Sequence, residues 1–244
     1  MNKKIAVTGE GPTDYGRYIY NQKDGKNEWE WGPVSVVLNR CIEDYGYENI
    51  PAIEFIPVQK EQIKSLKLLR TDKDLDGLAI PARKFKHYCR QNTWKYGIFY
   101  ADADKRESSA KVLREARHHF EEIYKEAAVG LEMDGNYEFI PMIPLKMIEC
   151  WLLADEESFQ MVYGTLPTLP KNPELIWGDK RDPKSDYPKH YLSRVLSQLS
   201  GREETGNQNV YCRLAEHIAP GTLREKCSVS FRRFYSDFKR LLEC

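Results

Sequence analysis

The chain has 244 residues, enough for one well-buried domain or for one domain with a substantial appendage. Hydrophobic residues make up 41% of it and charged residues 30%, which excludes long disordered stretches. The 37 basic and 37 acidic residues cancel, so net charge gives no evidence for attraction to nucleic acid. A neutral total is still compatible with a local basic face that binds nucleic acid.

Cysteine usage and hydropathy indicate the compartment. The six cysteines are widely spaced, form no Cys-x-x-Cys pair, and have no histidine at a zinc-finger spacing. Such scattered thiols are typical of a reduced cytoplasmic protein. The first apolar run is too short for a signal peptide, and none reaches the ~18 residues that span a bilayer. We therefore expect a cytoplasmic protein without membrane contact.

The first two thirds of the chain alternate apolar strand patterns with helical spacing. In chain order, the patterns predict a strand at 5–8, a helix at 34–46, a strand at 52–58, helices at 60–70 and 77–92, a strand at 96–101, a helix at 107–128, a strand at 137–143 and a helix at 146–154. Pro57 indicates that its strand lies at a sheet edge or that the proline marks the end of the strand. The alternation predicts a mainly parallel α/β sheet flanked by helices.

The character changes after residue 163, where prolines, glycines and charges predict a long loop. Helices are predicted at 188–200, 208–217 and 229–243. We expect an α/β core over 1–160 and a helical appendage over 161–244, packed on the core.

Two tryptophans, Trp29 and Trp31, lie in a segment, 21–33, that is too polar and irregular for a core. One interpretation is a loop that stacks on a base or docks a partner. The alternative is a loop folded back on the sheet.

Glu10 follows the first predicted strand, between Gly9 and Gly11. In an open α/β sheet, binding sites lie beyond the carboxyl ends of the strands, and Glu10 falls there. The two glycines permit a sharp turn and keep bulk away from the carboxylate. The structural alternative is a strand–helix turn in which Thr13 or Asp14 caps the helix.

Asp102 and Asp104 directly follow the strand predicted at 96–101. Alternate residues of an extended segment point the same way, so both carboxylates can face one ion. Mg²⁺ prefers a few carboxylate oxygens together with water and phosphate. The alternative is an acidic loop or a helix cap.

Glu149 lies within a strongly apolar helical pattern. A carboxylate in such a surface costs several kcal/mol unless it is paired or bound to a metal. The alternatives are a partner such as Lys146 or a position at the rim. Asp155 is more simply interpreted as a helix-end residue.

An ordered set of motifs, spread over nearly the whole chain, resembles the TOPRIM-like domains of unknown function in bacterial defence loci. These domains are similar to the TOPRIM nucleases of overcoming-lysogenization-defect proteins. The motifs are GEGPTD at 9–14, Asp102-x-Asp104, the Pro144-x-x-x-x-Glu149-x-Trp151-Leu-Leu-Ala-Asp155 helix, Pro173-Glu174 with Asp182-Pro183-Lys184, and Ser230-Phe231-x-x-Phe234.

The resemblance implies a TOPRIM core in which Glu10, Asp102 and Asp104 hold Mg²⁺ or Mn²⁺, Glu10 serving as ligand or general acid/base. It also implies an ABC- or AAA-type ATPase encoded nearby. Asp14 departs from the pattern, since many relatives have Glu there. A lysine near the scissile phosphate would stabilise developing charge, and Lys180 and Lys184 are the candidates.

The leading hypothesis is a magnesium-dependent nuclease acting on DNA or RNA in anti-phage defence, with Glu10, Asp102, Asp104, Glu149 and Lys184 as catalytic residues. Basic residues at 171–190 and in the last helix would steer the phosphate backbone, unless they are solvated surface charges. The alternative is a non-catalytic nucleic-acid-binding, sensor or effector subunit of an ATPase complex. A primase or topoisomerase activity is disfavoured, because no zinc ribbon or tyrosine-bearing cleavage domain is evident. A homodimer is compatible with the sequence.

Overall fold

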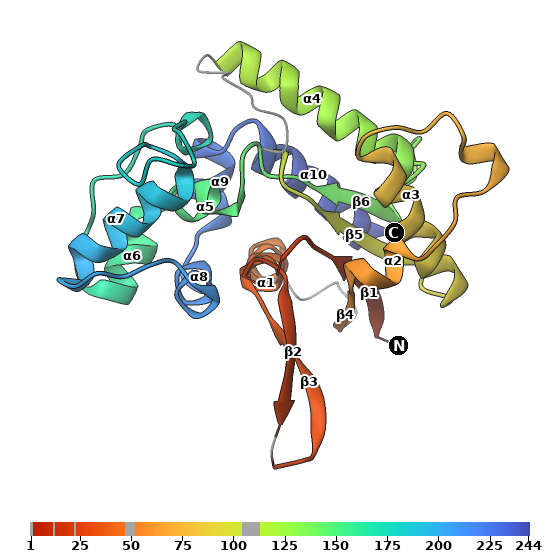
Figure 1. Ribbon diagram of the computed structural model, residues 1–244, viewed down its shortest axis with the longest axis horizontal. Helices are drawn as coiled ribbons and strands as arrows, with labels where there is room; N and C mark the ends of the chain where they lie inside the picture. Colours follow the sequence, from red (N-terminus) through yellow and green to blue (C-terminus); the bar gives the residue numbers. More distant parts are fainter. Residues whose placement is uncertain (1, 12, 22, 47–51, 104–112) are drawn as a thin grey trace.

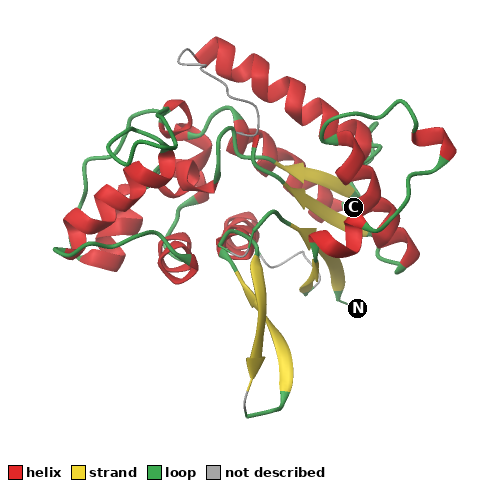
Figure 2. Ribbon diagram, viewed as in Figure 1, coloured by secondary structure: helices red, strands yellow, loops and turns green. Residues whose placement is uncertain are grey.

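A four-stranded parallel sheet forms the centre of the computed structural model, which describes residues 2–11, 13–21, 23–46, 52–103 and 113–244 (Figures 1 and 2). The strand order is β4 (Ile53–Val58), β1 (Lys3–Thr8), β5 (Tyr96–Tyr100) and β6 (Phe139–Met142). Every neighbouring pair is parallel, so the carboxyl ends of all four strands lie along one edge. These are the four predicted strands, and β4, which contains Pro57, is an edge strand as predicted.

Helices cover both faces of the sheet. Alternate residues of a strand point to opposite faces, and β1 shows this clearly. Ile5 and Val7 pack in one cluster with α1 (Pro33–Tyr45) and α10 (Ser230–Glu243). Ala6 packs in a second cluster with α3 (Ala79–Gln91) and α4 (Leu113–Gly130). Burial on both faces explains why these strands are continuous apolar runs.

An antiparallel hairpin, β2 (Gly16–Asn21) and β3 (Lys26–Trp31), is inserted between β1 and α1 and extends away from the sheet (Figure 2). The prediction of a loop for this segment is therefore wrong. Trp29 and Trp31 lie at the base of the hairpin, with ring centroids 4.8 and 5.7 Å from that of Tyr15. Both tryptophans pack on the core. This agrees with the second interpretation of the segment, in which it folds back on the sheet.

The region after the sheet is helical, as expected, and it gathers beside the sheet in Figure 1 except for α10, which packs on the sheet. In chain order it contains α5 (Ile148–Leu152), α6 (Glu156–Tyr163), the 3-10 turn η4 (Pro173–Leu175), α7 (Pro188–Ser200), α8 (Gln208–Ala215), α9 (Pro220–Lys226) and α10. The core cluster that contains Ile5 continues into these helices, and α6 spans the predicted division at residue 160. None of the described helices is long and apolar enough to cross a bilayer.

Two predicted helices are interrupted. The helix expected at 60–70 stops as α2 (Lys60–Lys64), followed by the 3-10 turn η2 (Arg70–Asp72). Within α2 only Ile63 is buried, and a helix with so little packing is not extended by propensity alone. The helix expected at 146–154 ends at Leu152, and Asp155 then caps α6 by accepting the Glu157 N–H at 3.1 Å. The prediction that Asp155 is a helix-end residue is confirmed.

Candidate functional site at the carboxyl edge of the sheet

The site begins where the chain changes direction in the sheet. From β1 the chain crosses through α1 to β4 on one side, and from β4 it crosses through α3 to β5 on the other side. The helices α1 and α3 cover opposite faces, so a crevice opens beyond the carboxyl ends of β1 and β5. Glu10 follows β1 and Asp102 follows β5, which is the edge predicted for both.

The loop after β1 is fixed by Tyr15. The buried Tyr15 hydroxyl donates a hydrogen bond to the Val7 carbonyl at 2.6 Å. Gly9 permits this fold, because a Cβ there would lie 2.3 Å from the Tyr15 Cβ, whereas a Cβ on Gly11 would meet nothing within 4 Å. The arrangement buries Asp14, which is 6% exposed. The chain then enters β2, so the alternative interpretation, a helix capped by Thr13 or Asp14, is wrong.

Asp102 lies two residues beyond β5 and is held by the strand's last residue. Tyr100 donates its hydroxyl hydrogen to Asp102 Oδ1 at 2.7 Å, as alternation along an extended segment allows. Burial and then the nearby Asp14 carboxylate raise the pKa of Asp102 well above its usual range, against the opposing hydrogen bond from Tyr100. Asp104, the predicted second ligand, lies outside the described residues.

Glu149 is completely buried in the first turn of α5. Its Oε1 accepts a hydrogen bond from the Tyr211 hydroxyl at 3.1 Å and lies 3.6 Å from Lys189 Nζ. Burial raises the pKa of Glu149, although Lys189 and Tyr211 pull it down. Glu149 lies in an apolar helical segment, as predicted, and is buried, but its carboxylate faces polar and charged groups. The cation beside it is Lys189, from α7, in place of the Lys146 that the sequence offered.

Charges link these groups into one cluster, which we call the carboxylate cluster: Glu10, Asp14, Asp102 and Glu149. Burial and repulsion from Glu149 raise the pKa of Asp14 to about 7, with Lys189 opposing. For Lys189, burial lowers the pKa, but attraction to Glu149, Asp14 and Asp102 outweighs burial and raises it overall. Asp14 therefore changes its charge near neutral pH.

The carboxylate cluster fits a divalent cation in the chemistry of its donors. Asp14 Oδ1 and Glu149 Oε2 are buried and have no hydrogen-bond partner within the described part of the chain. Buried acceptors of this kind require a proton, a water molecule or a cation. Among the described residues, however, no three His, Cys, Asp or Glu side chains stand close enough to hold one ion together. The cluster supplies hard oxygen ligands in a more open arrangement than a finished three-ligand site.

Several residues of the site differ from those that the sequence singled out. Lys184 is exposed in a turn, where its backbone N–H donates to Asp182 Oδ1 at 2.9 Å, and Lys180 is exposed nearby. Lys189 takes the place near the carboxylates. Asp14 was noted only as a capping residue and a departure from a motif, and the sequence contains no local signal for Tyr211, which reaches Glu149 from α8.

A second buried glutamate is structural. Glu174, 3% exposed, accepts hydrogen bonds from the Val229 and Ser230 N–H groups at 2.9 Å each, at the start of α10. It also accepts from the Ser230 hydroxyl. These N–H groups have no partner within the helix, so Glu174 satisfies them.

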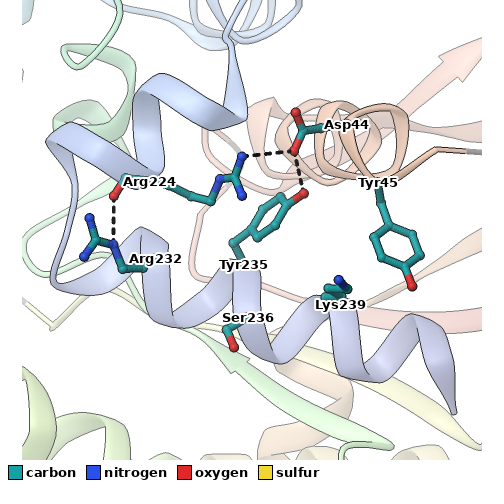
Figure 3. A pocket seen from close by; sticks show the side chains of 7 residues that line it. All are labelled: Asp44, Tyr45, Arg224, Arg232, Tyr235, Ser236 and Lys239. Atoms are coloured by element: carbon teal, nitrogen blue, oxygen red, sulfur yellow. Dashed lines mark hydrogen bonds and ion pairs between the residues drawn. The ribbon is translucent and has the colours of Figure 1, made fainter.

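A hollow of about 560 Å³ lies elsewhere, between the end of α1 and helices α9 and α10 (Figure 3). Asp44, its one lining carboxylate, accepts a hydrogen bond from Tyr235 and lies 3.6 Å from Arg224 Nη2. The hollow therefore lacks the free carboxylates of a metal or acid–base site.

The fold and the site define an α/β protein with a buried carboxylate cluster at the direction change of a parallel sheet. The chain belongs to the family described as Domain of unknown function (DUF4276), whose model matches residues 34–239. That match includes Asp102, Glu149 and Lys189 and begins after Glu10 and Asp14. Neither the curated proteins nor the solved structures contain a match.

Proposed function

We propose that this chain is a TOPRIM-like, divalent-metal-dependent nuclease that hydrolyses phosphodiester bonds in DNA or RNA. The observation that carries the proposal is the convergence of four carboxyl groups at the carboxyl edge of the sheet. Two of their buried oxygens, on Asp14 and Glu149, have no hydrogen-bond partner in the described part of the chain. Carboxylate oxygens are the ligands with which Mg²⁺ and Mn²⁺ are held beside a phosphate.

Ligands for Mg²⁺ or Mn²⁺ would come from among Glu10, Asp14, Asp102 and Glu149, no three of which surround one ion in the described part of the chain, and Asp104 joins them from the sequence alone. A metal ion bound here would polarise the phosphodiester and lower the pKa of water. Asp14, with a pKa of about 7, is suited to accept or give a proton at neutral pH. Lys189, close to Glu149, would attract the phosphate and oppose its growing negative charge.

The sequence resemblance alone supports the biological setting. We include in the proposal a role in anti-phage defence with an ABC- or AAA-type ATPase partner, in the cytoplasm, with a homodimer as one form of the assembly. These parts can fail independently of the chemistry.

One observation favours a second candidate, a non-catalytic nucleic-acid-binding or effector subunit of an ATPase complex. The described carboxylates do not stand close enough for three of them to hold one ion. A non-catalytic site that has the acidic residues of a nuclease but does not bring three of them around one ion would look like this.

The two candidates are separated by a cleavage assay on the full chain. Labelled single-stranded DNA, duplex DNA and RNA are incubated with Mg²⁺, Mn²⁺ or EDTA, with and without the ATPase encoded nearby. We expect cleavage that requires metal and falls at least about a hundredfold in Asp102→Asn and Glu149→Gln. Asp182→Asn, at an exposed carboxylate of the loop before α7, is the matched control and should cleave like the wild type.

Cleavage in EDTA, or wild-type rates in both site variants, would contradict the nuclease proposal. Nucleic-acid binding without cleavage under every metal condition would favour the second candidate.

A further inference from the structure

A pocket of about 250 Å³ adjoins the carboxylate cluster at Glu10. Its floor is the sheet edge, where Glu10, Phe99 and Tyr100 line it. Its walls come from α2 and α3 and from the segment before α3, which contribute Ile63, Leu78, Ile80 and Pro81. The volume lies below the ~300 Å³ at which sites for whole small molecules begin. The pocket therefore suits one flat, apolar group rather than a whole cofactor.

Three lysines surround this apolar pocket: Lys60 and Lys64 on α2 and Lys84 on α3. None of them forms an ion pair with a described carboxylate. Lys84 Nζ has only a long contact, 3.4 Å, with the Lys64 carbonyl. An apolar pocket lined on its helical side by three lysines that have no ion pair among the described residues matches a ligand that joins a ring to phosphates.

The pocket is part of a longer track along the site. A hollow of about 180 Å³ shares Glu10 and Lys60 with it and continues to Arg17, Tyr18 and Trp29 at the base of the hairpin. On the other side, a hollow of about 260 Å³ shares Leu78 and Pro81 and reaches Asp102. Glu10 and Asp102 thus line a row of three neighbouring hollows, which begins with an arginine and two aromatic rings and passes three lysines, with Glu61 and Glu126 lining its two outer hollows.

We propose that this track binds a single strand of DNA or RNA and that one unstacked nucleobase enters the 250 Å³ pocket. Lys60, Lys64 and Lys84 contact its flanking phosphates, and the next phosphate lies beside the carboxylate cluster. This inference rests on the proposed function and names the form of its substrate. A paired base is excluded from a pocket of this size, so a duplex must open before it binds. The exposed ring of Tyr18 offers a surface on which a neighbouring base can stack.

The test is a binding measurement in EDTA, so that no cleavage is needed. Ten-nucleotide single strands carry one 2-aminopurine, whose fluorescence rises when the base leaves the stack, at each position in turn. We expect tight binding to the single strand, at least tenfold weaker binding to the duplex, and a fluorescence rise confined to one or two neighbouring positions. Ile80→Trp, which fills the pocket, should abolish that rise while the affinity changes less than fivefold.

Charge reversal tests the lysines separately, without altering the apolar walls. Lys64→Glu and Lys84→Glu should each weaken binding at least tenfold and reduce its salt dependence. Lys67→Glu is the matched control, because Lys67 is exposed close to Lys64 in sequence but does not line the pocket. We expect its affinity to stay within threefold of the wild type. Thermal unfolding of each variant confirms that the comparison uses folded protein.

The inference is overturned if no position responds, if Ile80→Trp keeps the response, or if Lys67→Glu weakens binding as much as Lys64→Glu. Equal losses of affinity would mean that the nucleic acid is attracted to any nearby lysine, whether or not that lysine lines the pocket. A chain that binds with a positional response but never cleaves with metal supports this inference and contradicts the nuclease. Cleavage without any positional response overturns this inference alone.

Discussion

Lys189 Nζ lies 3.6 Å from Glu149 Oε1, so the tail of the chain supplies the cation that faces a completely buried carboxylate. Without Lys189, the pKa of Glu149 in the folded chain would rise further, while that of the unfolded chain would not change. The folded chain then binds more protons than the unfolded chain, and the free energy of unfolding falls as the pH rises through the raised pKa.

We therefore expect Lys189→Met to cost about 1–3 kcal/mol at pH 8 and less at pH 5, because the raised pKa of Glu149 favours its protonated form as the pH falls. Urea denaturation at the two pH values measures the difference. Lys184→Met, at an exposed lysine in the preceding turn, should change stability by less than about 0.5 kcal/mol. Equal losses at both pH values for Lys189→Met would show that the pair does not control Glu149.

If the proposed metal binds here, the pKa of Asp14, about 7, makes its binding depend on pH. A carboxyl group must lose its proton before it can bind a cation, so Mn²⁺ affinity should rise between pH 6 and pH 8 and binding should release protons. Calorimetry in buffers with different ionisation enthalpies measures both. Asp14→Asn should weaken binding at pH 8 and flatten the dependence. An affinity that is the same at pH 6 and pH 8 would contradict this role of Asp14.

Gly9 should be the less replaceable of the two glycines around Glu10. A Cβ at Gly9 would overlap the Tyr15 Cβ, and relieving the overlap would strain the hydrogen bond from Tyr15 to Val7. We expect Gly9→Ala to cost about 1–3 kcal/mol. Gly11→Ala, where the added Cβ meets nothing within 4 Å, should cost less than about 1 kcal/mol. Thermal unfolding compares the two, and similar losses would refute the steric explanation.

Of the two buried glutamates, we expect Glu174 to affect only stability and Glu149 to affect Mn²⁺ binding. Glu174 binds only N–H and O–H donors at the start of α10, so Glu174→Gln should lower the free energy of unfolding by about 1–3 kcal/mol. A Mn²⁺ titration of the folded variant should match the wild type. Glu149→Gln should weaken Mn²⁺ binding at least tenfold. The assignment fails if Glu174→Gln weakens Mn²⁺ binding as much as Glu149→Gln does.

Local patterns predicted the central sheet because β1, β5 and β6 are buried on both faces and β4 is still mostly apolar. The hairpin could not be predicted in the same way, since Lys26–Trp31 is mostly polar and four of the six residues of β2 are exposed. Its two strands are defined by pairing with each other and by the packing of Trp29 and Trp31 on Tyr15, which are tertiary effects.

The same limit applies to the site. Strand ends gave the positions of Glu10 and Asp102, and an apolar surrounding identified Glu149. Lys189 and Tyr211 reach Glu149 from separate helices whose docking no local pattern records. Asp14 belongs to the site because Tyr15 anchors its loop, and this tertiary contact leaves no signal in the local sequence.

The strand β1 pairs with both β4 and β5, and Lys3 Nζ at its start donates to the Leu241 and Leu242 carbonyls near the end of α10. A polypeptide that began at residue 34, where the family match begins, would leave two unpaired strand edges at the middle of its sheet. The shortest stretch that can fold cooperatively therefore includes the first strand, and the extent of sequence similarity is not the extent of the folding unit.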